Sequence, residues 1–134
     1  MEGKLGDLTK NISRHELVCR CGCGFDSMDF ETINVWQECC DYFAEELGVD
    51  KVTFNINSAA RCLEYNRKPV SEGGPGSTDG SFHPKARAID GKIVGVSQIK
   101  VYSYLDTKYP DKYGVGIYPN FVHLDTRTNG PARW

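Results

Sequence analysis

The chain has 134 residues, 40% of them hydrophobic and 25% charged, and its formal net charge is −2. This length predicts one domain, residues 1–134, that buries roughly two-thirds of the surface of the unfolded chain. The balanced charge argues against a general nucleic-acid or membrane-surface binder, and no stretch has the roughly 20 apolar residues of a membrane span. The first residues lack the apolar segment of a secretory signal. We therefore expect synthesis in the cytoplasm, or arrival elsewhere with help.

The first third of the chain predicts an irregular arm followed by a helix. Residues 1–26 are polar and rich in Gly and Cys, and we expect them to pack on the body of the domain. Apolar side chains then recur three and four positions apart, which is typical of an amphipathic helix. This helix is expected to begin after a cap at Ser27 or Asp29 and to run to Leu47, where Gly48 ends it.

The central third predicts two strands separated by a long loop. Residues 52–57 alternate between apolar and polar side chains, which indicates a strand with one buried face. Residues 58–66 predict a turn and a short helix. Residues 71–81, rich in Gly and Ser, predict a surface loop without regular structure, of the kind that is often functional. The second strand is predicted over residues 86–94.

The last third predicts a helix and two further strands. The helix covers residues 97–109, and its inner face is expected to carry Ile99, Tyr102 and Leu105. The strands cover residues 115–118 and 121–127. Helices and strands mix without regular alternation, which predicts an α+β fold with a small antiparallel sheet and helices on one side.

Two of the three histidines lie in segments suited to one metal ion. His83 precedes Asp90 by seven positions, and His123 and Asp125 are two apart, so on a strand they share a face. A catalytic zinc ion needs about three protein ligands and an open position for water. We therefore predict that His83, Asp90 and His123 bind zinc, which usually indicates hydrolysis. The alternative for either histidine alone is a hydrogen-bonded structural residue.

The six cysteines allow two interpretations. Cys19, Cys21 and Cys23 form a tight cluster that could hold a second, structural zinc ion, although CxCxC is not the usual pair of CxxC motifs. Without a secretory signal, reduced cysteines are favoured over disulfides. The favoured interpretation is a turn-rich segment with buried thiols, in which one disulfide to Cys62 is an open alternative.

Several ordered segments resemble the D-alanyl-D-alanine carboxypeptidase family of zinc peptidases, which includes phage L-alanyl-D-glutamate endopeptidases. Residues 81–90 resemble its S-x-H-x(6)-D motif, and residues 121–125 resemble the F-V-H-[VI]-D segment of one branch. That branch also has counterparts to three more segments, namely residues 19–25 (C-x-C-G-C-G-F), 58–66 (S-x-x-R-C-x-x-x-N) and 132–134. The resemblance spans residues 11 to 134, and the combination is more specific than any single motif.

The resemblance implies roles for five residues. His83, Asp90 and His123 would be the zinc ligands. Arg61 would bind a carboxylate or carbonyl of the substrate, which suits the charged fork of a guanidinium, and its alternative is a surface salt bridge. Ser81 would either form a hydrogen bond with the substrate or shape the turn.

Three features depart from the family pattern. Ala86 stands where the family usually has Gly, at a cost of about 1 kcal/mol if that backbone needs a positive φ. The loop before His83 is longer than usual. Asn120 occupies the position at which related branches place a Glu. Asp125 is then the nearest carboxylate, and it would either accept a proton from water or orient His123.

The resemblance implies a zinc peptidase, either a carboxypeptidase or an endopeptidase, that cuts the peptidoglycan stem peptide. The context would be a phage-type lysin, monomeric unless it belongs to a phage particle, that reaches the cell wall after release. We expect neither nucleic acid nor membrane as a partner. The alternative is a non-catalytic phage structural or wall-binding module that the same metal site stabilises.

Overall fold

The computed structural model describes residues 6–134, and a five-stranded sheet lies at its centre with the order β1-β2-β4-β3-β5. The first four strands pair antiparallel to their neighbours, and β5 adds parallel to β3. The strands are β1 Phe54–Ser58, β2 Ala88–Ile93, β3 Gly114–Ile117, β4 Val122–Asp125 and β5 Ala132–Arg133. The predicted α+β class is confirmed. Part of the predicted arm, residues 1–5, lies outside the described residues.

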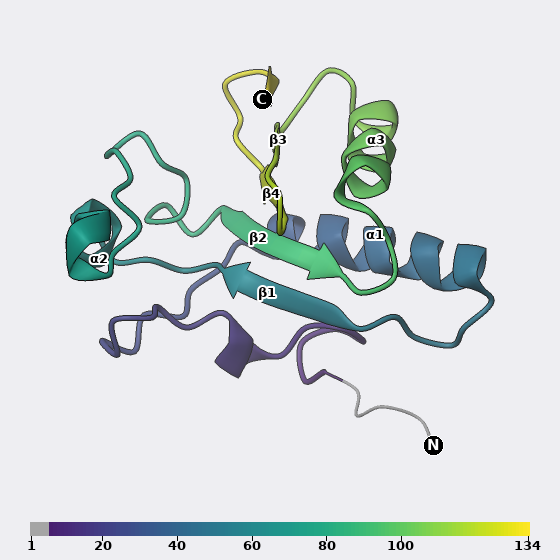
Figure 1. Cartoon of the computed structure of the whole chain (residues 1–134), viewed down its shortest axis with the longest axis horizontal. Coiled ribbons are helices and arrows are strands. Elements are labelled where there is room, and N and C mark those ends of the chain that lie inside the picture. The colour runs from purple at the N-terminus through teal and green to yellow at the C-terminus, as the bar shows by residue number, and fades with distance from the viewer. Residues whose placement is uncertain (1–5) are drawn as a thin grey trace.

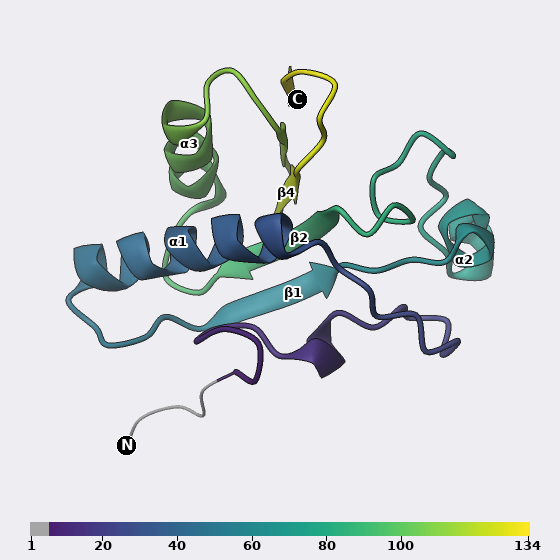
Figure 2. The same cartoon turned by 180° about the vertical axis from the view of Figure 1, so that it is seen from behind.

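The two long helices pack against the sheet and against each other (Figures 1 and 2). Helix α1, Phe30–Leu47, contacts β2 and β4, and helix α3, Gln98–Lys108, contacts β3 and β4. On β2, a Cβ at Gly91 would collide with the Phe54 ring and would lie 3.5 Å from Trp36 of α1, so position 91 faces this helix. Because side chains alternate along a strand, Asp90 faces the opposite side of the sheet.

The ends of α1 follow from local sequence, as predicted. The Asp29 side chain accepts a hydrogen bond from the Glu31 amide at 2.8 Å and caps the first turn. Gly48 ends the helix in the left-handed conformation, with φ 68°. The short helix α2, Leu63–Arg67, lies beyond the end of β1 and confirms the short helix expected there.

The inner face of α3 differs from the prediction. Val101 and Leu105 are fully buried, whereas Ile99 is 59% exposed. Successive three-residue steps drift by about 60° around a helix of 3.6 residues per turn, so Ile99 leaves the stripe that Leu105 occupies. Val101 and Leu105 are four residues apart, and a four-residue step stays on one face of a helix.

Three further elements differ from the prediction. A short 3-10 turn, Val70–Glu72, enters the loop that was expected to be irregular. Strand β2 begins at Ala88 rather than at Ala86, because Ala86 has φ 58° and cannot extend the strand. Strand β5 has two residues, too few for an alternating pattern to be detected in the sequence.

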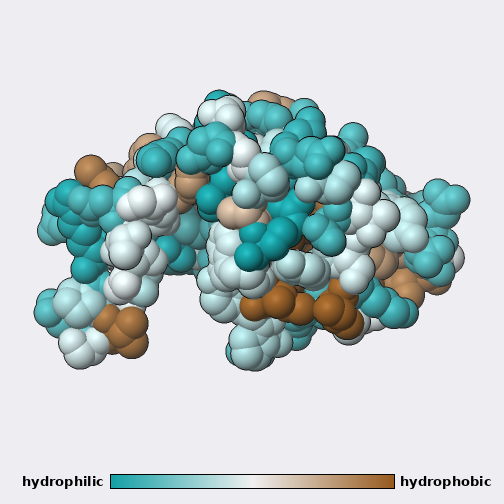
Figure 3. All heavy atoms as spheres, turned by 90° about the horizontal axis from the view of Figure 1, so that it is seen from above, coloured by the Kyte–Doolittle hydropathy of each residue, from teal (hydrophilic) through white to brown (hydrophobic). Residues whose placement is uncertain are grey.

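The core lies between the sheet and the two long helices. Its largest fully buried apolar side chains include Ile33, Trp36, Ile89, Leu105, Val115 and Leu124. The face drawn in Figure 3 is mainly hydrophilic, and its hydrophobic side chains form small separate groups. Within residues 6–134, no helix has the length and apolar character needed to cross a membrane.

Candidate metal centre

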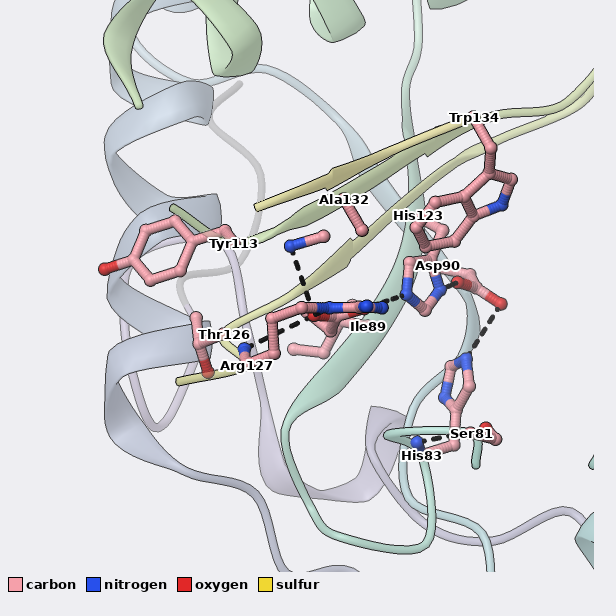
Figure 4. Close-up of polar contacts among 12 residues, drawn as sticks. Ser81, His83, Ile89, Asp90, Tyr113, His123, Thr126, Arg127, Ala132 and Trp134 are labelled. Atoms are coloured by element: carbon pink, nitrogen blue, oxygen red, sulfur yellow. Dashed lines mark hydrogen bonds and ion pairs between the residues drawn. The ribbon is translucent and has the colours of Figure 1, made fainter. Parts of the chain in front are cut away.

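The three predicted ligands meet on the sheet face opposite α1 (Figure 4). Asp90 of β2 and His123 of β4 are direct partners across the antiparallel pair, so their side chains lie next to each other. His83 comes from the turn that leads into β2. The register of two central strands therefore sets the position of two ligands, and one turn sets the third.

The ligand atoms lie close enough to share one ion. His83 Nε2 lies 3.2 Å from one Asp90 oxygen, and His123 Nδ1 lies 2.7 Å from the other. One ligand atom from each of the three residues falls within 4.8 Å of the others. Zinc with nitrogen and oxygen ligands at about 2.0–2.1 Å places neighbouring ligand atoms about 3.3 Å apart. The observed spacing is compatible with such a site.

The second nitrogen of each imidazole is held by a fixed acceptor. His83 Nδ1 donates to the Ala59 carbonyl at 2.7 Å, and His123 Nε2 donates to Asp125 Oδ2 at 2.8 Å. In the neutral ring of each histidine the lone-pair nitrogen therefore faces the Asp90 carboxylate. A lone pair that faces a carboxylate needs a cation between them, either a proton or a metal ion. This donor set and these outer hydrogen bonds fit zinc.

The electrostatics of the cluster favour a bound cation. Burial alone would raise the pKa of the Asp90 carboxyl, but His123 and His83 hold it well below its usual range. Burial alone would lower the pKa of His123, but Asp125 and Asp90 raise it above its ordinary value. The carboxylates thus stay ionised and attract positive charge, which a metal ion supplies when it displaces the imidazole proton.

A tight turn brings His83 back toward β2. The Ala86 amide donates to the His83 carbonyl at 3.2 Å, and the Ala86 carbonyl accepts from the Asp29 amide at 2.7 Å. Ala86 adopts φ 58°, so the positive φ that its family position suggested is present. The Ser81 hydroxyl accepts from the His83 amide at 3.3 Å and therefore shapes the same turn. A hydroxyl can donate as well as accept, and Ser81 also lines the cavity of about 460 Å³ that contains the three ligands.

Arg61 forms part of the wall of the centre. Its side chain is buried and donates to Ser58 Oγ, Asn66 Oδ1 and Ser77 Oγ at 2.9–3.1 Å. Its Nη2 lies 3.5 Å from Asp90 Oδ2. The surface salt bridge considered as the alternative for Arg61 is therefore wrong, because the guanidinium is buried beside the proposed ligands.

The Asp125 carboxylate is occupied by hydrogen bonds on both oxygens. Oδ1 accepts from the Gly114 amide and from the backbone and Nε of Arg127, and Oδ2 accepts from His123 and from Arg127 Nη2. Five donors thus surround a group with about four lone-pair sites. Burial alone would raise the pKa of Asp125, but Arg127 and His123 hold it well below its usual range. This arrangement suits a residue that orients His123.

Comparison with known proteins places this chain in a family. The pattern of the family described as Peptidase M15 matches residues 10–125. The chain belongs to the peptidase M15 family. This is the D-alanyl-D-alanine carboxypeptidase family of zinc peptidases that the motifs indicated. All three proposed ligands and Arg61 lie within the matched range.

A curated relative of this M15 chain is the probable peptidoglycan L,D-endopeptidase MepK of Haemophilus influenzae, 45% identical over 60 residues. The aligned segment covers 43% of this chain and 30% of the relative. The chain thus matches less than a third of the length of MepK. No solved structure matches the chain.

The centre formed by His83, Asp90 and His123 lies in a cavity of about 460 Å³. The cavity has aromatic walls that the sequence analysis did not predict. The Trp134 ring lies 5.1 Å from the His123 ring, and its Nε1 donates to the Tyr118 hydroxyl at 2.8 Å. Arg127 stacks 4.5 Å above the Phe82 ring. Of these wall residues, Arg127 could have been found from the sequence. It follows Asp125 by two residues, and side chains two positions apart lie on the same face of an extended chain. A larger hollow of about 620 Å³ between α1 and α3 contains none of the proposed ligands.

The other two positions at which the sequence directs a search for a proton carrier, Asp79 and Asn120, do not line the cavity. Asp79 is exposed and binds Arg67 through two hydrogen bonds of 2.7 Å. Asn120 is exposed in the turn between β3 and β4. Of the described residues that line the cavity, the two with side-chain carboxylates are Asp90 and Asp125.

The cysteines are reduced, as the favoured interpretation expects. All six are free thiols, and the disulfide to Cys62 that this interpretation allowed is not formed. Cys19 is buried, but Cys21 and Cys23 are exposed, because the turns that carry them lie on the surface. The segment is rich in turns, as predicted.

Proposed function

We propose that this domain is a zinc-dependent peptidase that hydrolyses a peptide bond in the peptidoglycan stem. The observation that carries the proposal is the buried arrangement of His83, Asp90 and His123, with both imidazoles turned toward one carboxylate. Membership of a zinc peptidase family supports the chemistry. The printed name of the Haemophilus relative supports peptidoglycan as the substrate.

Three side chains would hold the metal, through His83 Nε2, a carboxylate oxygen of Asp90 and His123 Nδ1. Zinc bound there would polarise the scissile carbonyl and lower the pKa of water toward about 7. The protein contributes orientation. The Ala59 carbonyl and the Asp125 carboxylate fix the tautomer and tilt of the two rings, so the ligands need little rearrangement when the ion arrives.

Arg61 would bind the substrate. Its guanidinium is already held by three acceptors, and its Nη2 is 3.5 Å from Asp90, so a group bound to Nη2 lies next to the proposed metal. A carboxylate or carbonyl of the stem peptide suits this charged donor. The Ser81 hydroxyl and the aromatic walls would complete the contacts with the peptide.

We assign Asp125 the orienting role rather than that of general base. A base needs a free lone pair and a pKa close to the working pH. The five donors around Asp125 and its lowered pKa argue against both. The donors of Arg127 and His123 therefore occupy the Asp125 carboxylate, which orients His123.

A non-catalytic, metal-stabilised module is the second candidate, and Asn120 at the position of the usual Glu favours it. The family resemblance also suggests a phage context, either as a free lysin or as a component of a phage particle. We propose that such a domain meets the cell wall in this phage context.

The test is digestion of purified peptidoglycan and defined stem peptides, with products identified by mass spectrometry. We expect cleavage within the stem, its loss with a chelator and its return with zinc. His83→Ala should abolish cleavage, and His15→Ala is the matched control because His15 is exposed in the arm. Folded, zinc-loaded protein that cleaves no stem bond would favour the non-catalytic module.

A further inference from the structure

Four cysteines from two distant segments gather at a second site. Cys19, Cys21 and Cys23 lie in the arm, and Cys62 caps the first turn of α2. The sulfur of Cys19 lies 3.4 Å from that of Cys21 and 3.9 Å from that of Cys62, and Cys21 and Cys62 are 3.7 Å apart. All four sulfurs lie within 4.8 Å of one another.

We propose that these four cysteines bind a second, structural zinc ion. Zinc bound to four thiolates at about 2.3 Å places the sulfurs about 3.8 Å apart, close to the observed spacing. A disulfide would need sulfurs about 2.05 Å apart, and the structure has none. A site with four sulfur ligands is closed, so it stabilises the fold and has no position for a substrate.

The backbone around the cluster suits this role. Gly22 and Gly24 have φ 86° and 88°, which turns the chain after each cysteine in a way that residues with a side chain rarely adopt. The Cys62 amide donates to the Cys19 sulfur at 3.5 Å, and the Tyr65 amide donates to the Cys62 sulfur at 3.4 Å. Donors directed at sulfur stabilise thiolates, the form that binds metal.

The ion would join the arm to the segment that carries Arg61. Cys62 follows Arg61 directly, and the Ala60 amide already donates to the Leu17 carbonyl at 3.0 Å. Arg20, between two of the cysteines, donates to the carbonyls of Ile56 and Asn57 at the end of β1. These contacts align the two segments, and zinc would lock them. Four thiols lose four protons to solvent as the ion binds.

Cobalt(II) in place of zinc provides a direct test. The double variant His83→Ala/His123→Ala removes the first site, and we expect it to retain one equivalent of cobalt with intense thiolate-to-metal charge-transfer absorption. Adding Cys21→Ser and Cys23→Ser should abolish that absorption. Cys40→Ala is the control, because Cys40 lies in the core outside the cluster. A cobalt spectrum without sulfur bands in the double variant would overturn the proposal.

A second measurement uses the unaltered chain, in case a variant does not fold. Cys21 and Cys23 are exposed, so a thiol reagent should label them at once if no metal is bound. With zinc present we expect both to resist labelling until a chelator is added, and amide hydrogen exchange over residues 58–66 to accelerate afterwards. Immediate labelling of both in zinc-loaded protein would contradict the proposal. Neither readout depends on hydrolysis, so failure of the proposed peptidase activity would leave this result intact.

Discussion

Replacing Asp125 with Asn tests how the centre is held together. The substitution keeps the shape of the side chain but changes one acceptor oxygen to an NH2 group. The Asp125 oxygens face the donors of His123, Arg127 and Gly114, so the amide places a donor against a donor on one side or the other. His123 then loses its fixed tautomer, or Arg127 loses half of its two-pronged contact.

The expected magnitude follows from the orienting role. Loss of an outer partner of a metal ligand weakens zinc binding by roughly 10- to 100-fold, or about 1.4–2.7 kcal/mol. Excess zinc should then restore most of the rate. Loss of a general base would instead lower the rate by roughly 100- to 10,000-fold with zinc still bound.

The assay measures zinc affinity by competition with a chromogenic chelator, and then hydrolysis with zinc in excess. Asp79→Asn is the matched control, because it breaks an Asp–Arg pair that does not line the cavity. It should change neither quantity. A variant at Asp125 that binds zinc normally but stays inactive in excess zinc would contradict the orienting role and restore Asp125 as the base.

Three further predictions address substrate binding, strain and pH. Arg61→Ala should lower kcat/KM by roughly 10- to 100-fold with zinc content unchanged, and Arg61→Lys should recover little, because a point charge does not replace a fork. Near-normal turnover by the alanine variant would contradict the substrate role. Ala86→Gly should raise the free energy of unfolding by about 1 kcal/mol in denaturant melts, because Ala86 has a positive φ. Ala132→Gly, in strand β5, should lower it instead, and equal effects at both positions would argue against strain at Ala86. The pKa of Asp125 is lowered in the folded state, so its contribution to stability is full above about pH 4 and declines as the pH falls below that value. Acid titrations of stability should show a smaller loss in Asp125→Asn than in the unaltered chain, and an equal loss would contradict the assignment.

Features set by neighbouring residues could be predicted from the sequence. The cap at Asp29 and the glycine at position 48 locate α1, because both act within one turn of the helix. The spacing of His123 and Asp125 indicated a shared strand face, and the structure places both side chains on the side of the sheet that carries Asp90. The strain at Ala86 could also be anticipated, because Ala stands where the resembling family usually has Gly.

Features that depend on tertiary packing could not be predicted in this way. The choice between base and orienting residue at Asp125 rests on Arg127, whose side chain folds back over Phe82 after the strand has ended. Cys62 joins the other cysteines only because the arm packs beside α2, across 43 positions of sequence from Cys19. The spacing of Asp125 and Arg127 indicates only a shared face, and the number of cysteines indicates only that Cys62 could have a partner, so local patterns give the contacts of neither arrangement.

The decisive measurement for the proposed zinc peptidase is the dependence of stem-peptide cleavage on metal. Metal is removed from the purified chain under reducing conditions, and retained fold is confirmed by circular dichroism. Hydrolysis of a defined stem peptide is then measured as zinc is added back. We predict no hydrolysis without metal and recovery with zinc in the unaltered chain, but no recovery in His123→Ala. Equal hydrolysis by the metal-free and zinc-loaded chain would contradict a zinc peptidase built on His83, Asp90 and His123.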